Sequence, residues 1–63
     1  MNVGKNIKHF REAKKLFQKE VIATIDMGAA QYSRIESGKT EPSISTLDRI
    51  AKALGIEIAD FLF

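Results

Sequence analysis

The side chains best suited to contacting another molecule lie between residues 28 and 38. At 3.6 residues per turn, one side of a helix over this segment is small, polar and singly basic, and consists of Ala30, Ser33, Arg34 and Ser37. Tyr32 and Ile35 fall on the other side, with Ala29 and Gln31 on the flanks. A solvated helix without a binding role more often carries Glu and Lys on its outer side, whereas small residues let a backbone approach a ligand closely. We therefore interpret this segment, which Gly38 ends, as a recognition helix suited to a groove.

Catalysis and metal binding have little support in the residue types. The 63 residues include no Cys and one His, His9, which forms no metal cluster without carboxylates from distant parts of the chain. There is no Gly-rich phosphate loop and no paired carboxylate arrangement. We expect no enzyme, no metal or other cofactor and no small-molecule ligand.

Charge alone does not identify a partner. The net charge is +2, but six of the ten Lys and Arg residues lie within the first 20 positions. An asymmetry of this size fits either an anionic partner or an ordinary solvated surface. No apolar run approaches the roughly 20 residues of a membrane span or the core of a signal peptide. We therefore expect a cytoplasmic protein without a membrane association.

Helical periodicity continues on both sides of the recognition helix. A first helix is predicted over residues 4–15, and a second begins at Gln18 and ends in a tight turn at residues 26–28. A further helix is capped by Ser43 and Gly55, and a final turn or two covers residues 57–62. A chain of 63 residues stabilises a single core only marginally, which favours local helical contacts. The fold class is thus all-α, one compact bundle over residues 1–63.

Two apolar side chains at helix starts are expected to pack inward. Phe17 precedes the second helix and is expected to staple against it. Ile44 shares the helical spacing of the apolar side in the fourth helix, together with Leu47, Ile50, Ala51 and Leu54.

The run YSRIESGKTEPS, followed by TLDRIAKALGI, is far more specific than a generic two-helix pattern. With these runs the chain resembles the lambda-repressor-like helix-turn-helix domains of the Cro/C1 and xenobiotic-response-element type over nearly its whole length. The resemblance implies a five-helix domain whose helices 2 and 3 form the helix-turn-helix motif. It also implies a transcriptional repressor or activator that pairs as a homodimer over a near-palindromic operator in double-stranded DNA.

The resemblance further implies roles for single residues. Arg11 and Glu36 would form an internal ion pair, and Arg34 would reach toward bases. Ala29 and Ala30 lack hydrogen-bonding groups and leave methyl contacts with thymine. The expected DNA contacts are Gln18, Lys19, Gly28, Ala29, Ala30, Gln31, Ser33, Arg34, Lys39 and Thr40.

Four positions depart from the family pattern. Phe17 stands where Ser or Thr is common, and Gly28 stands where a capping Ser or Thr is usual. Ile22 replaces a small residue and is expected to push the two motif helices apart slightly. Asp26 replaces the turn Gly, and an Asp can adopt the left-handed conformation at some cost.

Apolar residues near the end of the chain predict self-association. Ile56, Phe61 and Phe63 are too many apolar side chains for the last eight residues to bury alone, so we expect them at the homodimer interface.

The alternative function is a protein-interaction or antitoxin-like module on the same fold. Salt dependence separates the two, because only DNA binding with several phosphate contacts weakens steeply as salt rises.

Overall fold

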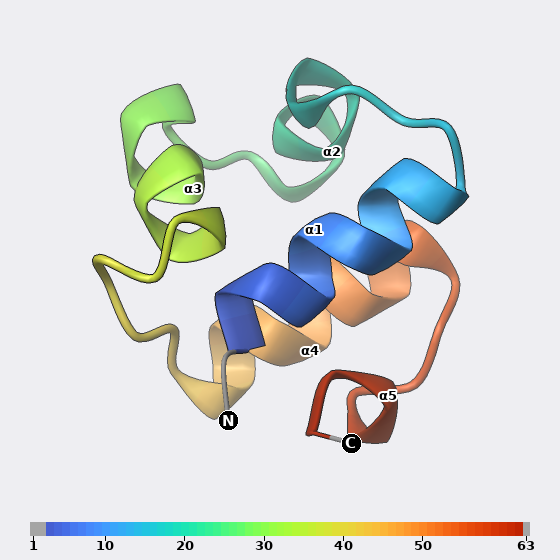
Figure 1. Cartoon of the computed structure of the whole chain (residues 1–63). Helices are drawn as coiled ribbons and strands as arrows, with labels where there is room; N and C mark the ends of the chain where they lie inside the picture. The colour runs from blue at the N-terminus through green and yellow to red at the C-terminus, as the bar shows by residue number, and fades with distance from the viewer. Residues whose placement is uncertain (1–2, 63) are drawn as a thin grey trace.

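Five helices make up residues 3–62, which are the residues that the computed structural model describes (Figure 1). They are α1 (Val3–Ala13), α2 (Gln18–Ile25), α3 (Ala29–Glu36), α4 (Ile44–Leu54) and α5 (Ala59–Leu62). Helix α1 crosses the middle of the molecule and packs against α3, α4 and α5, while α2 packs against α3 and α4. The predicted all-α, five-helix fold is therefore confirmed.

Each helix contributes to one hydrophobic core. The buried apolar side chains are Ile7, Val21, Ile25, Tyr32, Ile35, Leu47, Ile50, Ala51, Leu54 and Phe61. Within α2, α3 and α4 these side chains recur every three or four residues, which is the periodicity seen in the sequence. The core thus lies where the motif helices α2 and α3 meet α1 and α4.

The helix ends follow local chemistry. The Ser43 hydroxyl accepts a hydrogen bond from the Thr46 backbone N–H at 3.1 Å, and Gly55 ends α4 with φ at +71°, so both predicted caps are confirmed. Gly38 follows α3 with φ at +83°. Helix α1 ends at Ala13, two residues earlier than predicted, because Lys15 takes a left-handed conformation (φ +60°) that breaks the helix.

Two packing expectations are wrong. The side chain of Phe17 is 69% exposed and that of Ile44 is 67% exposed. Phe17 is the N-cap residue of α2, where its backbone N–H donates to the Glu20 carboxylate, and its ring is left in solvent. Ile44 is the first residue of α4, and no element of the described chain covers it.

The expected dimer residue Phe61 is instead part of the core. Its side chain has no exposed surface, and its ring meets the ring of Phe10 edge to face at 6.1 Å. Asn6 donates from Nδ2 to the Phe61 carbonyl oxygen at 2.7 Å, which ties α5 back onto α1. Ile56 is half-buried against the core, and Phe63 lies outside the described residues.

None of the helices within residues 3–62 is both long and apolar enough to cross a bilayer. The same residues contain no group of three His, Asp or Glu side chains that could hold a metal ion.

Candidate nucleic-acid interface

Helix α3 divides into a buried and an exposed side as its sequence predicts. Tyr32, Ile35 and Glu36 are buried. The exposed residues are Ala29, Ala30, Gln31, Ser33 and Arg34. The helix therefore presents a small, polar and singly basic surface, while its other side is fixed in the core.

The backbone of α3 touches the backbone of α1. Gly4, in the first turn of α1, is buried, and a Cβ added there would collide with the Ile35 carbonyl oxygen and lie 3.0 Å from that of Glu36. Only glycine permits this approach, which brings the C-terminal half of α3 directly against α1.

The turn between the motif helices contains a strained residue. Asp26 ends α2 with φ at +55° and ψ at +57°, and its N–H donates to the Ile22 carbonyl at 2.9 Å. This is the left-handed conformation that the sequence predicted for an Asp in place of Gly. Ile22 remains half-buried against the core.

The Arg11–Glu36 pair that the resemblance implies is present at the inner side of α3. Arg11 donates from Nε to Glu36 Oε2 at 2.6 Å and from Nη2 to Oε1 at 3.0 Å. Only 8% and 3% of the two side chains are exposed. Arg11 also donates from Nη1 to the Leu16 carbonyl at 2.6 Å, so one guanidinium joins α1, the start of α2 and α3.

The electrostatics of Glu36 follow from these contacts. Burial by itself raises the pKa of the carboxyl, but the hydrogen bonds from Arg11 above all, and from Gln18 Nε2 at 3.0 Å, hold that pKa below its usual value. The buried Tyr32 hydroxyl lies beside the Glu36 carboxylate, although no hydrogen bond of standard geometry reaches it within residues 3–62. Burial, and then the nearby Glu36 carboxylate, raise the pKa of this phenol.

Most of the expected DNA contacts lie on the surface. Lys19, Gly28, Lys39 and Thr40 are exposed, as are the outward residues of α3, whereas Gln18 is half-buried. One amide hydrogen of Gln18 is used by Glu36, which leaves the second for another acceptor. The backbone N–H groups of Lys39 and Thr40 donate to the Arg34 carbonyl at 2.9 and 3.3 Å, so this loop folds back onto the end of α3.

One basic residue beside α3 was missed by the sequence interpretation. Lys8, on α1, is exposed and lines a shallow hollow together with Gln18, Ser33, Glu36 and Ser37. Lys8 lies one helical turn before Arg11, so the expected contact of Arg11 with α3 could have placed it on this side.

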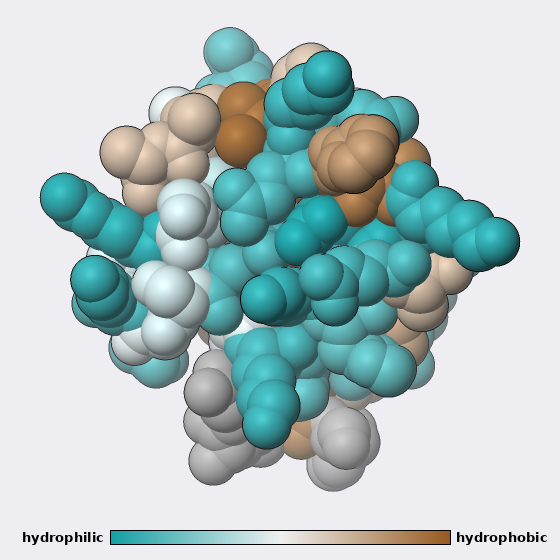
Figure 2. Space-filling view, turned by 45° about the horizontal axis from the view of Figure 1, so that its top comes forward, coloured by the Kyte–Doolittle hydropathy of each residue, from teal (hydrophilic) through white to brown (hydrophobic). Residues whose placement is uncertain are grey.

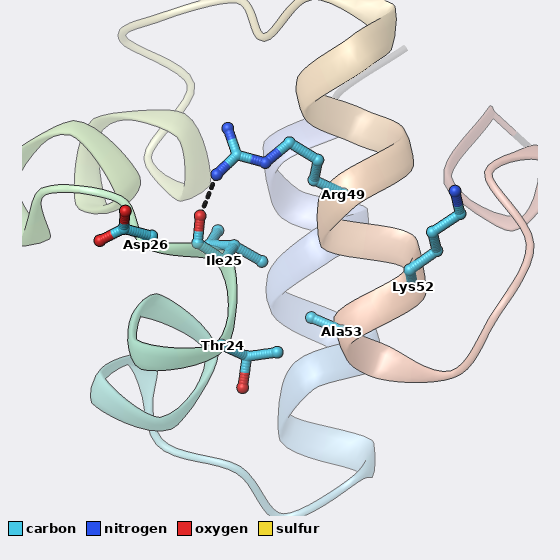
Figure 3. Close-up of a pocket in the computed structure, with 6 residues that line it drawn as sticks. All are labelled: Thr24, Ile25, Asp26, Arg49, Lys52 and Ala53. Carbon is cyan, nitrogen blue, oxygen red and sulfur yellow. Dashed lines mark hydrogen bonds between the residues drawn. The ribbon is translucent and has the colours of Figure 1, made fainter.

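A second hollow lies between α2 and α4 (Figure 3). Its lining residues are Thr24, Ile25, Asp26, Arg49, Lys52 and Ala53. Arg49 reaches across and donates from Nη2 to the Ile25 carbonyl oxygen at the end of α2. This contact attaches the motif turn to α4, so we assign Arg49 a structural role.

Comparison with known proteins agrees with this geometry. A helix-turn-helix family model matches residues 7–61. The chain belongs to the Cro/C1-type helix-turn-helix family. This is a family of DNA-binding regulators, which agrees with the family resemblance of the sequence.

Two of the Cro/C1-type relatives are a phage repressor and a control protein. The immunity repressor protein of Bacillus phage phi105 is 36% identical over 59 residues, which are 94% of this chain and 41% of the repressor. The control protein C.MunI of a Mycoplasma species is 36% identical over 58 residues, 90% of this chain and 78% of that protein. The chain thus spans about two fifths of the phage repressor's length.

A solved structure shows the same fold. The restriction-modification controller protein C.AhdI from Aeromonas hydrophila superimposes with a TM-score of 0.90, covering 95% of this chain and 91% of that one. Sequence identity is 23%, so the likeness concerns the arrangement of the five Cro/C1-type helices.

Proposed function

We propose that this chain is a sequence-specific DNA-binding transcriptional regulator that places α3 in the major groove of double-stranded DNA. One observation carries the proposal. The exposed side of α3 is small, polar and singly basic, while the buried Arg11–Glu36 pair and the core hold the other side in place. A helix fixed in this way presents its outward side chains with little loss of entropy on binding.

The exposed residues divide into two kinds of contact. Arg34 suits the hydrogen-bond acceptors of a guanine edge, and Gln31, one turn earlier, suits adenine or a phosphate. Gln18, Lys19, Lys39 and Thr40 would bind the phosphate backbone around the groove, and Lys8 extends this set from α1. Gly28 and Ser33 would contribute close backbone and hydroxyl contacts at the helix surface. The names of the relatives, an immunity repressor and a control protein, support a regulatory role of this kind.

Homodimerisation is part of the same proposal. A helix-turn-helix dimer reads two half-sites about 34 Å apart, and near-palindromic operators match its symmetry. The core position of Phe61 removes it from the interface, which leaves Ile56 as the half-buried candidate among the described residues. Sedimentation of the protein on its selected duplex tests the dimer, and a single protomer per duplex would exclude it.

A regulator that acts by binding DNA needs no catalytic residue. We also expect this regulator to lie in the cytoplasm.

A selection of bound fragments from random duplex DNA tests the main proposal. We expect an enriched motif, and an affinity whose logarithm falls linearly with the logarithm of salt, by about 0.9 per phosphate contact. Recovery of random sequences only, with salt-insensitive binding, would contradict it.

A protein-interaction or antitoxin-like module is the second candidate. The exposed Ile44 is the one observation in its favour, and it is weak support, because single exposed apolar side chains are common on the surface of globular proteins. The salt titration separates the two candidates, since an apolar protein interface is nearly insensitive to salt.

A further inference from the structure

An apolar hollow lies where the first turn of α2 meets the start of α3. It is lined by Phe17, Gln18, Lys19, Ile22 and Ala29. Phe17 is 69% exposed and Ile22 is half-buried, and these two residues give the hollow its apolar lining. Figure 2 shows brown, apolar surface among the teal on the side where α2 and α3 come forward.

Two of the side chains around this hollow have partners in the free protein. Gln18 is held by its hydrogen bond to the buried carboxylate of Glu36, at 3.0 Å. The ammonium group of Lys19 lies 6.0 Å from the centre of the Phe17 ring, within the range of a cation–π contact. Ala29 is the first residue of α3 and adds only a methyl group. The hollow is open to solvent, so a small apolar group can enter it.

We infer that the hollow receives the 5-methyl group of a thymine in the operator. This inference rests on the proposed function and deepens it. The hollow is continuous with the proposed DNA surface, because Gln18, Lys19 and Ala29 belong to both. The thymine methyl is the apolar group that base edges present in the major groove, and the adjacent base atoms are hydrogen-bonding groups that Phe17 and Ile22 cannot satisfy.

The positive charge beside the hollow also favours a thymine methyl group as its occupant. The Lys19 ammonium stands beside the hollow, where the phosphate of the nucleotide that carries the methyl group would need a cation. An apolar segment of a partner protein would use that cation only if it also carried an acidic side chain, whereas every nucleotide carries a phosphate. Phe17 therefore acts as a specificity-determining residue for thymine, and Lys19 binds the phosphate of the same nucleotide.

Deoxyuridine provides the test, because it differs from thymidine only in lacking this methyl group. Each thymine of the selected duplex is replaced singly by deoxyuridine, and the dissociation constants are measured by fluorescence anisotropy. Burial of one methyl-sized group predicts about a fourfold loss of affinity at one thymine in each half-site. For Phe17→Ala the ratio between the uracil and thymine duplexes should fall below about twofold at that position, because most of the apolar wall is gone. Ile44→Ala is the matched control, since it removes an equally exposed apolar side chain outside the hollow and should keep the full ratio.

Three results would overturn the inference. Every uracil duplex could bind as tightly as the parent, Phe17→Ala could keep the fourfold ratio, or Ile44→Ala could lose it equally. Each leaves specific DNA binding intact, so the proposed function would stand while the thymine contact falls. Failure to select any duplex would remove both.

Discussion

Arg11 and Glu36 join α1 to α3 through two hydrogen bonds, 2.6 Å from Nε to Oε2 and 3.0 Å from Nη2 to Oε1. The same guanidinium binds the Leu16 carbonyl, and the same carboxylate accepts from Gln18. The pair thus fixes the position of both motif helices relative to α1. The surface that α3 presents depends on an interaction that never reaches that surface.

Replacing Glu36 by Gln should destabilise the protein strongly. The amide keeps nearly the shape of the carboxylate but leaves the Arg11 guanidinium buried without a counter-charge, which costs about 3 to 5 kcal/mol. Thermal melts of Glu36→Gln measure this loss. Asp48→Asn is the matched control, because Asp48 pairs with Lys52 at 3.0 Å with both side chains largely in solvent. An equal effect of the two substitutions would mean that burial of the Arg11 pair adds nothing.

The lowered pKa of Glu36 predicts a loss of stability in acid. The unfolded chain takes up the proton near the ordinary value of 4.5 and the folded chain only at lower pH. The contribution of Glu36 is therefore complete above about pH 4.5 and disappears as pH falls through the folded value. Melting temperatures followed from neutral pH into acid should fall more steeply for the wild type than for Glu36→Gln. The other carboxylates are common to both proteins, so parallel curves would contradict the prediction.

The close approach of α1 to α3 predicts a second sensitive position. Alanine usually favours a helix over glycine, but at Gly4 its methyl group collides with the Ile35 carbonyl and must push the two helices apart. We expect Gly4→Ala to lower the free energy of unfolding by about 1 to 3 kcal/mol. Gly28→Ser is the control, because a Cβ at Gly28 meets nothing within 4 Å and a Ser hydroxyl can cap α3. A higher melting temperature for Gly4→Ala would show that the helices separate at no cost.

Helical periodicity is the property of the sequence that predicts most of the fold. It identifies five helices, and the capping types of Ser43 and Gly55 locate the ends of α4. The charge of Glu36 on an otherwise buried side indicates a partner, and the family resemblance supplies Arg11. The division of α3 into a buried and an exposed side follows from spacing alone.

Periodicity does not tell which neighbour covers an apolar side chain. The apolar content of the last eight residues predicts Phe61 at a dimer interface, yet the Asn6 side chain donates to its carbonyl oxygen and its ring packs against Phe10 of α1. Ile44 shares the spacing of the apolar side of α4, but it is the first residue of that helix and is 67% exposed. Phe17 was expected to pack, and the chain instead uses its backbone as the cap of α2. These outcomes depend on tertiary contacts that short-range spacing does not encode.

The left-handed turn residue Asp26 predicts a stabilising substitution. Its Cβ disfavours φ at +55°, and glycine adopts this conformation without that cost. We expect Asp26→Gly to raise the free energy of unfolding by up to about 1 kcal/mol, after allowing for the greater freedom of glycine in the unfolded chain. Asp26→Ala removes the same carboxylate but keeps the Cβ, so it should be less stable than Asp26→Gly in urea melts. If the two variants are equally stable, the carboxylate and not the backbone decides the effect.

The last prediction separates base reading from phosphate binding. Arg34 projects from the exposed side of α3, whereas Lys39 lies in the loop after Gly38. Arg34→Ala should cost about 1 to 3 kcal/mol on the selected operator and relax the preference at one base pair in each half-site, because a bidentate contact to guanine is lost. Lys39→Ala should weaken all duplexes almost equally and reduce the salt slope by about one unit per protomer. Competition binding against operators with single base changes, repeated at two salt concentrations, distinguishes the two effects. If Arg34→Ala weakens every duplex alike and keeps the base preference, Arg34 contacts a phosphate, and base recognition falls to Gln31 with the methyl contacts of Ala29 and Ala30.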